Sequence, residues 1–158
     1  MPLRSDWSEA TCPIARSLDV VGDPWVLLVL REALTGATRF EQFRDALGVA
    51  DTVLSRRLSA MVDADLLVRT PYVDRHRTRH EYLLTGAGRD LLPVVNALAQ
   101  WGERHRARPT GRLEVVHEGC GRTSRSADTC TACGVRLTTD TVSWRRPRDS
   151  GGLTPLSR

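Results

Sequence analysis

Residues 51–64 read DTVLSRRLSAMVDA, and this stretch decides how the rest of the chain is interpreted. At 100° per residue it forms an amphipathic helix with one apolar side. The apolar side carries Leu54, Leu58, Met61 and Val62. The opposite side and its flanks carry Thr52, Ser55, Arg56, Arg57, Ser59 and Asp63. That polar side is basic near the helix start, where a helix in the DNA major groove reaches base edges. Such a side is equally typical of a solvated face on an ordinary helix, so the neighbouring segments must show whether this helix binds DNA.

The preceding segment predicts a shorter helix that leads into this one. Thr38 is expected to cap a helix from residue 39 to about residue 47, with Phe40 and Phe43 on its inward side. A tight connection, Gly48-Val49-Ala50, follows, and Asp51 is expected to cap the next helix by accepting backbone N–H bonds. Two short helices joined by a glycine-bearing turn, the second with a basic outer face, indicate a helix-turn-helix.

The segment after the helix-turn-helix changes to a strand pattern. LVRTPYV (67–73) and RHEYLLT (79–85) predict two strands, joined by a polar turn over 74–80. The turn carries the basic residues Arg75, His76, Arg77, Arg79 and His80. A basic hairpin tip alone is usually only solvated, but directly after a helix-turn-helix it is typical of a wing that contacts the DNA backbone.

The flanking helices predict the core and a dimer. The helix from Pro24 to Leu34 is apolar almost all round, which indicates burial on several sides, and a short helix over 13–20 precedes it. Thr85 is expected to cap a long helix from Gly86 to about Arg106, with a kink at Pro93. Its apolar surface is wider than one small domain covers, which favours packing against a second copy in a homodimer.

Composition sets the broad class. The 158 residues are 41% hydrophobic and 27% charged, with a net charge of +4 and a pI of about 9.3, so a globular protein with an anionic partner is favoured. Every basic residue other than histidine is arginine, a bias that we attribute to GC-rich coding. The sequence has neither an 18-residue apolar run nor a signal-peptide pattern, so we expect a cytoplasmic protein without a membrane partner. Its four cysteines are then expected as thiols or metal ligands.

The C-terminal segment predicts a metal site. His117-x-x-Cys120 and Cys130-x-x-Cys133 form two knuckles, and glycine follows the second ligand of each. Four ligands complete a tetrahedral structural Zn²⁺ site, as in a zinc ribbon, with neighbouring strands over 113–117 and 135–137. An alternative is a metal-free segment with free thiols or a redox pair. A zinc deaminase is disfavoured because the His-x-Glu base of that chemistry is missing.

With these residues noted, the chain resembles the HxlR-type regulators, a branch of the winged-helix transcription factors related to the MarR family. The resemblance covers residues 12–105 and is carried by four segments: CPIARSLDVVGDPW, LREALTGATRFEQFRDAL, LSRRLSAMVDADLLVRTPY and EYLLTGAGRDLLPVVNALAQWG. One departure is Gly22-Asp23-Pro24-Trp25, where the family usually has Gly-Gly-Lys-Trp. The resemblance implies a homodimer that binds operator DNA, with repression the favoured sign, and whose first and last helices form the dimer.

Site residues follow from the resemblance by position. The residues that it implies as DNA-facing are Arg39, Thr52, Ser55, Arg56, Arg57, Arg75, His76, Arg77 and Arg79. Cys12 occupies the place of a redox-sensing cysteine in some family members, and a helix N-terminus stabilises a thiolate. Its alternative is a small packing residue, which a Cys12→Ser variant would distinguish. A small-molecule effector pocket is expected near Trp25.

The expected fold class is therefore mainly α with a small β-hairpin: a winged helix-turn-helix plus a short β-rich metal-knuckle tail. The expected boundaries are a flexible N-terminus over 1–11, the DNA-binding and dimerisation domain over 12–108, a zinc-ribbon-like extension over 109–144 and a disordered tail over 145–158. Two other functions stay open: a thiol- or zinc-dependent redox enzyme, and a protein-interaction module that uses the ribbon. Neither a Ser-His-Asp set nor paired carboxylates support the enzyme.

Overall fold

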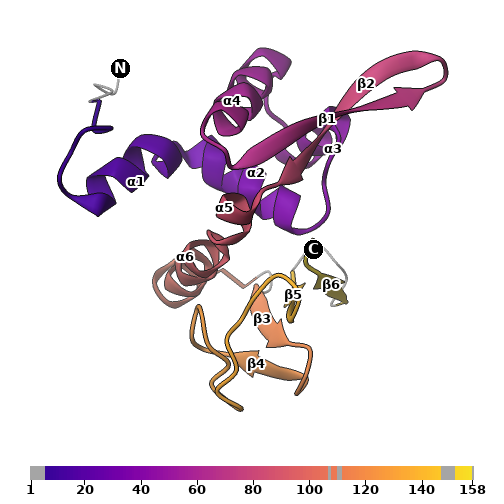
Figure 1. Ribbon diagram of the computed structural model, residues 1–158. Coiled ribbons are helices and arrows are strands. Elements are labelled where there is room, and N and C mark those ends of the chain that lie inside the picture. The colour runs from indigo at the N-terminus through magenta and orange to yellow at the C-terminus, as the bar shows by residue number, and fades with distance from the viewer. Residues whose placement is uncertain (1–5, 107, 110–111, 147–151, 158) are drawn as a thin grey trace.

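The computed structural model describes residues 6–106, 108–109, 112–146 and 152–157 (Figure 1). The N-terminal helices are α1 (Pro13–Val21), α2 (Pro24–Leu34), α3 (Phe40–Leu47) and α4 (Asp51–Asp63). A hairpin of β1 (Leu67–Asp74) and β2 (Arg77–Leu84) follows, and then α5 (Gly86–Arg89) and α6 (Leu92–His105). The C-terminal strands are β3 (Glu114–His117), β4 (Arg122–Ser124), β5 (Val142–Arg145) and β6 (Leu153–Pro155). The fold is a winged helix-turn-helix with a small C-terminal sheet, as the sequence predicted.

Helix α2 is the centre of the core, as its apolar composition predicted. Its Leu30 and Leu34 are fully buried, and they join Phe43 from α3 and Leu58 from α4 in one hydrophobic cluster. Burying a side chain of this size stabilises the fold by roughly 1.5–3 kcal/mol. The helix-turn-helix is therefore fixed by its inward faces, which leaves its outer faces to solvent.

The ends of α3 and α4 differ in detail from the sequence predictions. Neither Thr38 nor Asp51 is the capping residue: the N-caps are Arg39 and Ala50, and Asp51 is the first residue of α4. At α3 the side chain of Gln42 accepts the backbone N–H bonds of Thr38 and Arg39, both at 2.9 Å. Asp51 still stabilises the helix, because a carboxylate in the first turn interacts favourably with the positive end of the helix dipole.

The hairpin is longer, and its turn tighter, than the sequence predicted. Strands β1 and β2 pair antiparallel out to Asp74 and Arg77, so the turn consists of Arg75 and His76 alone. Both have positive φ angles, 45° and 66°, as a two-residue turn that matches the twist of a hairpin requires. Arg77 and the following residues to His80 therefore belong to β2 rather than to a loop.

The predicted long helix over 86–106 is divided in two. Thr85 caps α5, its hydroxyl oxygen accepting the Gly88 N–H at 3.0 Å, and α6 begins only at Leu92. Pro93 lacks the N–H that would bond to the carbonyl of Arg89, which explains the break. Gly88 is required where α5 meets the hairpin base, because an added Cβ would lie 2.3 Å from the Leu66 carbonyl oxygen.

The C-terminal sheet has the strand order β4-β3-β5-β6, with antiparallel pairs throughout. The predicted strand at 113–117 is present, but residues 135–137 form only an isolated bridge, between Arg136 and Thr129. Disorder over 145–158 is wrong for Arg145 and for 152–157: Arg145 ends β5, β6 pairs with β5, and Leu156 is buried. Residues 147–151 and 158, also in that prediction, lie outside the described residues.

The C-terminal sheet packs on the helices through hydrogen bonds as well as apolar contacts. The fully buried Trp144 donates its indole N–H to the Asn96 side chain of α6 at 3.0 Å. Asn96 in turn donates to the Ala127 carbonyl at 2.9 Å. At the other end of the sheet, the Ser157 amide donates to the Leu34 carbonyl of α2 at 2.6 Å. The sheet therefore braces both α2 and α6. Across the described ranges, no helix has the length and apolar character needed to span a membrane.

Candidate nucleic-acid interface and metal centre

The outer face of α4 is exposed where the sequence predicted DNA contact. Thr52, Ser55 and Arg56 are exposed, whereas Leu54 and Leu58 on the same helix are buried. Within the described residues, Arg56 takes part in no ion pair. Its guanidinium, which can donate two parallel hydrogen bonds, is therefore available to an external acceptor.

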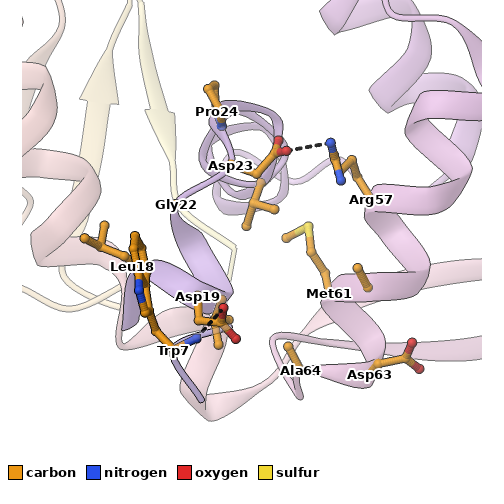
Figure 2. Close-up of a pocket in the computed structure, with 13 residues that line it drawn as sticks. Trp7, Leu18, Asp19, Gly22, Asp23, Pro24, Arg57, Met61, Asp63 and Ala64 are labelled. Carbon is orange, nitrogen blue, oxygen red and sulfur yellow. Dashed lines mark hydrogen bonds and ion pairs between the residues drawn. The ribbon is translucent and has the colours of Figure 1, made fainter. Parts of the chain in front are cut away.

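Arg57 has an intramolecular partner that the sequence did not reveal. Its Nη2 lies 2.5 Å from Oδ2 of Asp23, across the gap between α4 and the start of α2 (Figure 2). The other carboxylate oxygen of Asp23 accepts the Trp25 N–H at 2.9 Å and so caps α2. The Nε of Arg57 is buried without a hydrogen-bond partner among the described residues. Arg57 therefore ties α4 to α2.

The hairpin divides its basic residues into two groups. Arg75, His76 and Arg77 are exposed at or beside the tip, and no described residue forms an ion pair with them. Arg79, two positions further along β2, pairs with Glu41 of α3 at 2.7 Å and with Asp74 at 3.4 Å. It fixes the hairpin to the helix-turn-helix.

Arg39 contacts the half of the hairpin nearer its tip. Its guanidinium lies 4.8 Å from the ring centroid of Tyr72 in β1, at cation–π distance, although the residue remains exposed overall. The sequence prediction missed Asp23 and Glu41, which engage Arg57 and Arg79. No local signal identifies such pairs, because their members are far apart in the chain and meet only in the fold.

The four predicted metal ligands converge in the C-terminal sheet. Their ligand atoms all lie within 4.8 Å of one another. Nδ1 of His117 is 3.3 Å from Sγ of Cys120 and 3.2 Å from Sγ of Cys133, and Sγ of Cys120 is 3.7 Å from Sγ of Cys130. A tetrahedral zinc site with ordinary bond lengths has ligand atoms roughly 3.5–3.8 Å apart. The cluster therefore fits a metal ion with only small adjustments, and it can hold one.

The backbone conformation and hydrogen bonds of the knuckles favour metal binding by their cysteines. Gly121 and Gly134, which follow the second ligands, have φ angles of 67° and 75°, a conformation that glycine adopts without strain. A backbone hydrogen bond from Ala132 is the main cause that lowers the pKa of the Cys130 thiol to about 6, against the opposing effect of burial. A thiolate is the form of cysteine that binds metals. His117 and Cys130 are buried, while Cys120 and Cys133 reach the surface.

Cys12 lies outside this cluster. It is the N-cap residue of α1, and its thiol is exposed. Arg16, one turn further along α1, donates to the carbonyls of Ala10 and Thr11, at 2.6 and 3.0 Å. Redox sensing at Cys12 stays a prediction.

A cavity of about 810 Å³ lies between α1, the start of α2 and α4 (Figure 2). Its lining includes Gly22, Asp23, Pro24 and Val26, but the side chain predicted to mark it, Trp25, is not part of it. An effector pocket near Trp25 stays a prediction. On the α4 side, Arg57 and Met61 face the cavity.

Comparison with known proteins identifies the fold's family. The family model described as HxlR-like helix-turn-helix matches residues 20–109, more than half of the chain. The chain belongs to the HxlR family. An HTH-type transcriptional regulator of Mycobacterium tuberculosis, Rv3095, itself uncharacterized, is 41% identical over 130 residues, which are 82% of each chain. Membership assigns the protein to a family of transcriptional regulators rather than of enzymes.

Solved structures of similar proteins agree with this assignment. The crystal structure of PA1607, named a putative transcription factor, superposes with a TM-score of 0.71 at 34% identity and covers 84% of this chain and 93% of that chain. Because 84% is more than residues 1–109 contain, this likeness continues into the C-terminal region. The redox regulator HypR in its reduced form superposes with a TM-score of 0.56 at 29% identity, over 60% of this chain and 94% of that chain. Some HxlR-type proteins are thus redox regulators.

Proposed function

We propose that this HxlR-family protein is a homodimeric, sequence-specific DNA-binding regulator whose α4 lies in the major groove and whose hairpin tip follows the phosphate backbone. The strongest support is that Arg56 of α4 and Arg75 and Arg77 of the hairpin are exposed and form no ion pair with a described residue. Figure 1 shows α4 and the hairpin at the end of the molecule opposite the C-terminal sheet. The sign of regulation that the resemblance favours is repression, and reporter transcription with and without the protein would test it.

The contacts within the chain reduce the number of residues that we propose to contact DNA. Thr52, Ser55 and Arg56 are the proposed base-reading residues, because they lie in the first turns of α4 and are exposed. The proposed phosphate-contacting residues are Arg75, His76 and Arg77. The other predicted DNA contacts, Arg39, Arg57 and Arg79, have partners within the chain and are proposed to hold the reading elements in place.

Replacement of Arg77 by alanine is expected to weaken binding to operator and random DNA to a similar extent. A phosphate contact carries no base information, and its loss should reduce the slope of log K against log salt by about 1. Fluorescence anisotropy over a salt series measures both quantities. Arg136→Ala removes an exposed arginine from the C-terminal region and serves as the matched control. A loss confined to the operator would contradict the phosphate assignment.

The proposed dimer surface combines α1 and α6. On α6, Val94, Leu98 and Trp101 are 42%, 48% and 50% exposed and follow one another at helical spacing. On α1, Ile14 is 69% exposed. Apolar side chains in such a row are typical of a surface that a partner covers, and a two-fold dimer matches a palindromic operator.

Leu98→Glu is expected to convert the dimer into a monomer at micromolar concentration, because it would bury an unpaired carboxylate at the centre of the interface. Analytical ultracentrifugation measures the change, and circular dichroism checks that the fold is intact. Leu153→Glu, at a residue of similar exposure on β6, is the matched control and should leave the mass of the assembly unchanged. A wild-type protein that sediments as a monomer would contradict the proposed dimer.

The proposed occupant of the cysteine-histidine cluster is a structural Zn²⁺ ion held by His117, Cys120, Cys130 and Cys133. Three thiolates and one imidazole are ligands that zinc prefers, and four protein ligands leave no open position for a substrate. The segment between the knuckles supports a bracing role, because Ala127 and Ser126 accept hydrogen bonds from Asn96 and Gln100 of α6, at 2.9 and 3.1 Å. Zinc would hold this segment against α6, and no enzymatic activity is proposed for it.

A further inference from the structure

The cavity between α1, α2 and α4 has a composition that favours one class of ligand. Its apolar lining includes Trp7, Leu18 and Met61, and the first two of these are 42% and 47% exposed. Small-molecule sites are mostly apolar cavities of roughly 300–1,000 Å³ with a few polar groups, and this cavity falls within that range. Three carboxylates and one guanidinium are the charged groups of its lining, so its formal charge is negative.

The carboxylates are not equivalent. Asp23 is paired with Arg57 at 2.5 Å, so this pair is nearly neutral. Asp19 accepts the backbone N–H of Trp7, at 3.3 Å. Neither Asp19 nor Asp63, which is exposed at the end of α4, forms an ion pair with a described residue. Two carboxylates therefore remain uncompensated beside apolar surface. An anionic ligand would meet both of them and would have to displace Asp23 to reach Arg57.

We propose that this cavity binds an amphiphilic organic cation, and that the bound cation weakens operator binding through Arg57. The apolar body would lie against Leu18 and Met61, and the positive charge would lie between Asp19 and Asp63. The indole of Trp7, which Figure 2 shows beside Leu18, provides an aromatic face for the same charge. Desolvated cation–π contacts add to the attraction of the carboxylates.

The coupling to DNA binding rests on the proposed function, whereas the binding itself does not. Five of the lining residues belong to α4 or its C-terminal end, among them Arg57 and Met61. Asp23 lines the same cavity as Asp19 and Asp63, so a cation held between those two carboxylates also attracts the Asp23 carboxylate and weakens its pair with Arg57. The pair is open to competition because both of its side chains are partly exposed, 28% for Arg57 and 29% for Asp23. Loss of this pair would allow α4 to shift against α2 while its apolar face stays packed, and by reciprocity DNA would weaken the binding of the cation.

The test uses two ions of the same shape and opposite charge, tetraphenylphosphonium and tetraphenylborate, titrated into the full-length protein by calorimetry. The phosphonium is expected to bind at least about tenfold more tightly, because two carboxylates near the protein surface attract it and repel the borate. The net charge of +4 would favour the borate at non-specific sites, so the opposite preference identifies this cavity. Equal affinities, or no binding of either ion, would overturn the proposal.

Variants locate the site and separate binding from coupling. The double variant Asp19→Asn/Asp63→Asn is expected to lower phosphonium affinity about tenfold or more, whereas Asp90→Asn/Asp140→Asn, with the same change of charge, leaves it unchanged. Saturating phosphonium is expected to weaken operator binding of the wild type about tenfold, but not that of Asp19→Asn/Asp63→Asn. Phosphonium affinity that is insensitive to both double variants would overturn the site.

The remaining outcomes test different claims. Phosphonium binding without any effect on DNA affinity would overturn the coupling alone. Absence of operator binding in the ligand-free protein would instead contradict the proposed function.

Discussion

Replacement of Arg56 by alanine is expected to lower affinity for the operator by roughly 5- to 150-fold, the range of one bidentate contact to a base, while affinity for random DNA falls much less. Arg56 is exposed on the second turn of α4, and no described residue pairs with it. The adjacent Arg57 is held by Asp23, so it does not substitute for the lost contact. Competitive gel shifts with operator and random DNA measure the ratio of the two affinities.

Two further variants make the experiment specific. Arg56→Lys keeps the positive charge but loses the planar fork, so it should retain much of the random-DNA affinity and still relax base preference. Arg104→Ala removes an exposed arginine at the end of α6, away from the proposed interface, and should change neither affinity. Equal losses of Arg56→Ala on operator and random DNA would show that Arg56 contacts phosphate rather than bases.

Replacement of Cys130 by serine is expected to remove the bound metal and lower the melting temperature by about 10 °C. Cys130 is the most buried of the cysteines, at 1% exposure, and a serine hydroxyl is a poor zinc ligand. Loss of a structural ion and of the segment it holds is worth at least about 3 kcal/mol, and 1 kcal/mol shifts the melting temperature of a domain of this size by roughly 2–4 °C. Mass spectrometry of bound metal and thermal denaturation measure the two effects.

Cys12→Ser is the matched control for this experiment. Cys12 is an exposed thiol outside the cluster, so its replacement should leave both the metal content and the melting temperature unchanged. Treatment of the wild type with a strong chelator should reproduce the lowered melting temperature of Cys130→Ser. A wild-type protein that is purified without metal and melts at the same temperature as Cys130→Ser would contradict the zinc proposal.

The consequences of metal loss should extend beyond the C-terminal sheet. Asn96 of α6 is fully buried and bonds both to Trp144 and to the Ala127 carbonyl between the knuckles. The neighbouring turns of α6 carry Leu98 and Trp101 of the proposed dimer surface. Disorder in the knuckles would leave the Asn96 amide partly unsatisfied in the interior, which is unfavourable. The metal centre and the dimer helix are therefore physically connected.

The sequence predicted those features that depend on local pattern. The apolar stripe of α4, the apolar α2 and the strand alternation after Leu67 each specify an element and its buried face. The spacing of His117, Cys120, Cys130 and Cys133 likewise predicted a cluster that the fold assembles. These signals are local because burial repeats with the helix or strand period, and because a knuckle places its two ligands within one turn.

Features that depend on residues far apart in the chain could not be predicted from the sequence. Arg57 is paired because Asp23, the N-cap residue of α2, lies beside it. Arg56, its neighbour in the sequence, has no such carboxylate beside it among the described residues. The two-residue turn of the hairpin was missed because Arg75 and His76 are not the residues that usually favour positive φ angles. Strand β6 was missed because a segment rich in Arg, Pro, Gly and Ser lacks periodicity, and its order depends on pairing with β5 and on the burial of Leu156.

The central claim, a dimer that reads an operator, is tested most directly by a footprint of the full-length protein on DNA from the intergenic region upstream of its gene. The titration should be done at about 0.15 M salt with excess random DNA, because affinity without salt and competitor does not report specificity. The account predicts a compact, two-fold symmetric footprint whose half-sites are separated by about one helical turn or a multiple of it. Weak protection that random DNA removes as readily as the specific fragment would contradict it.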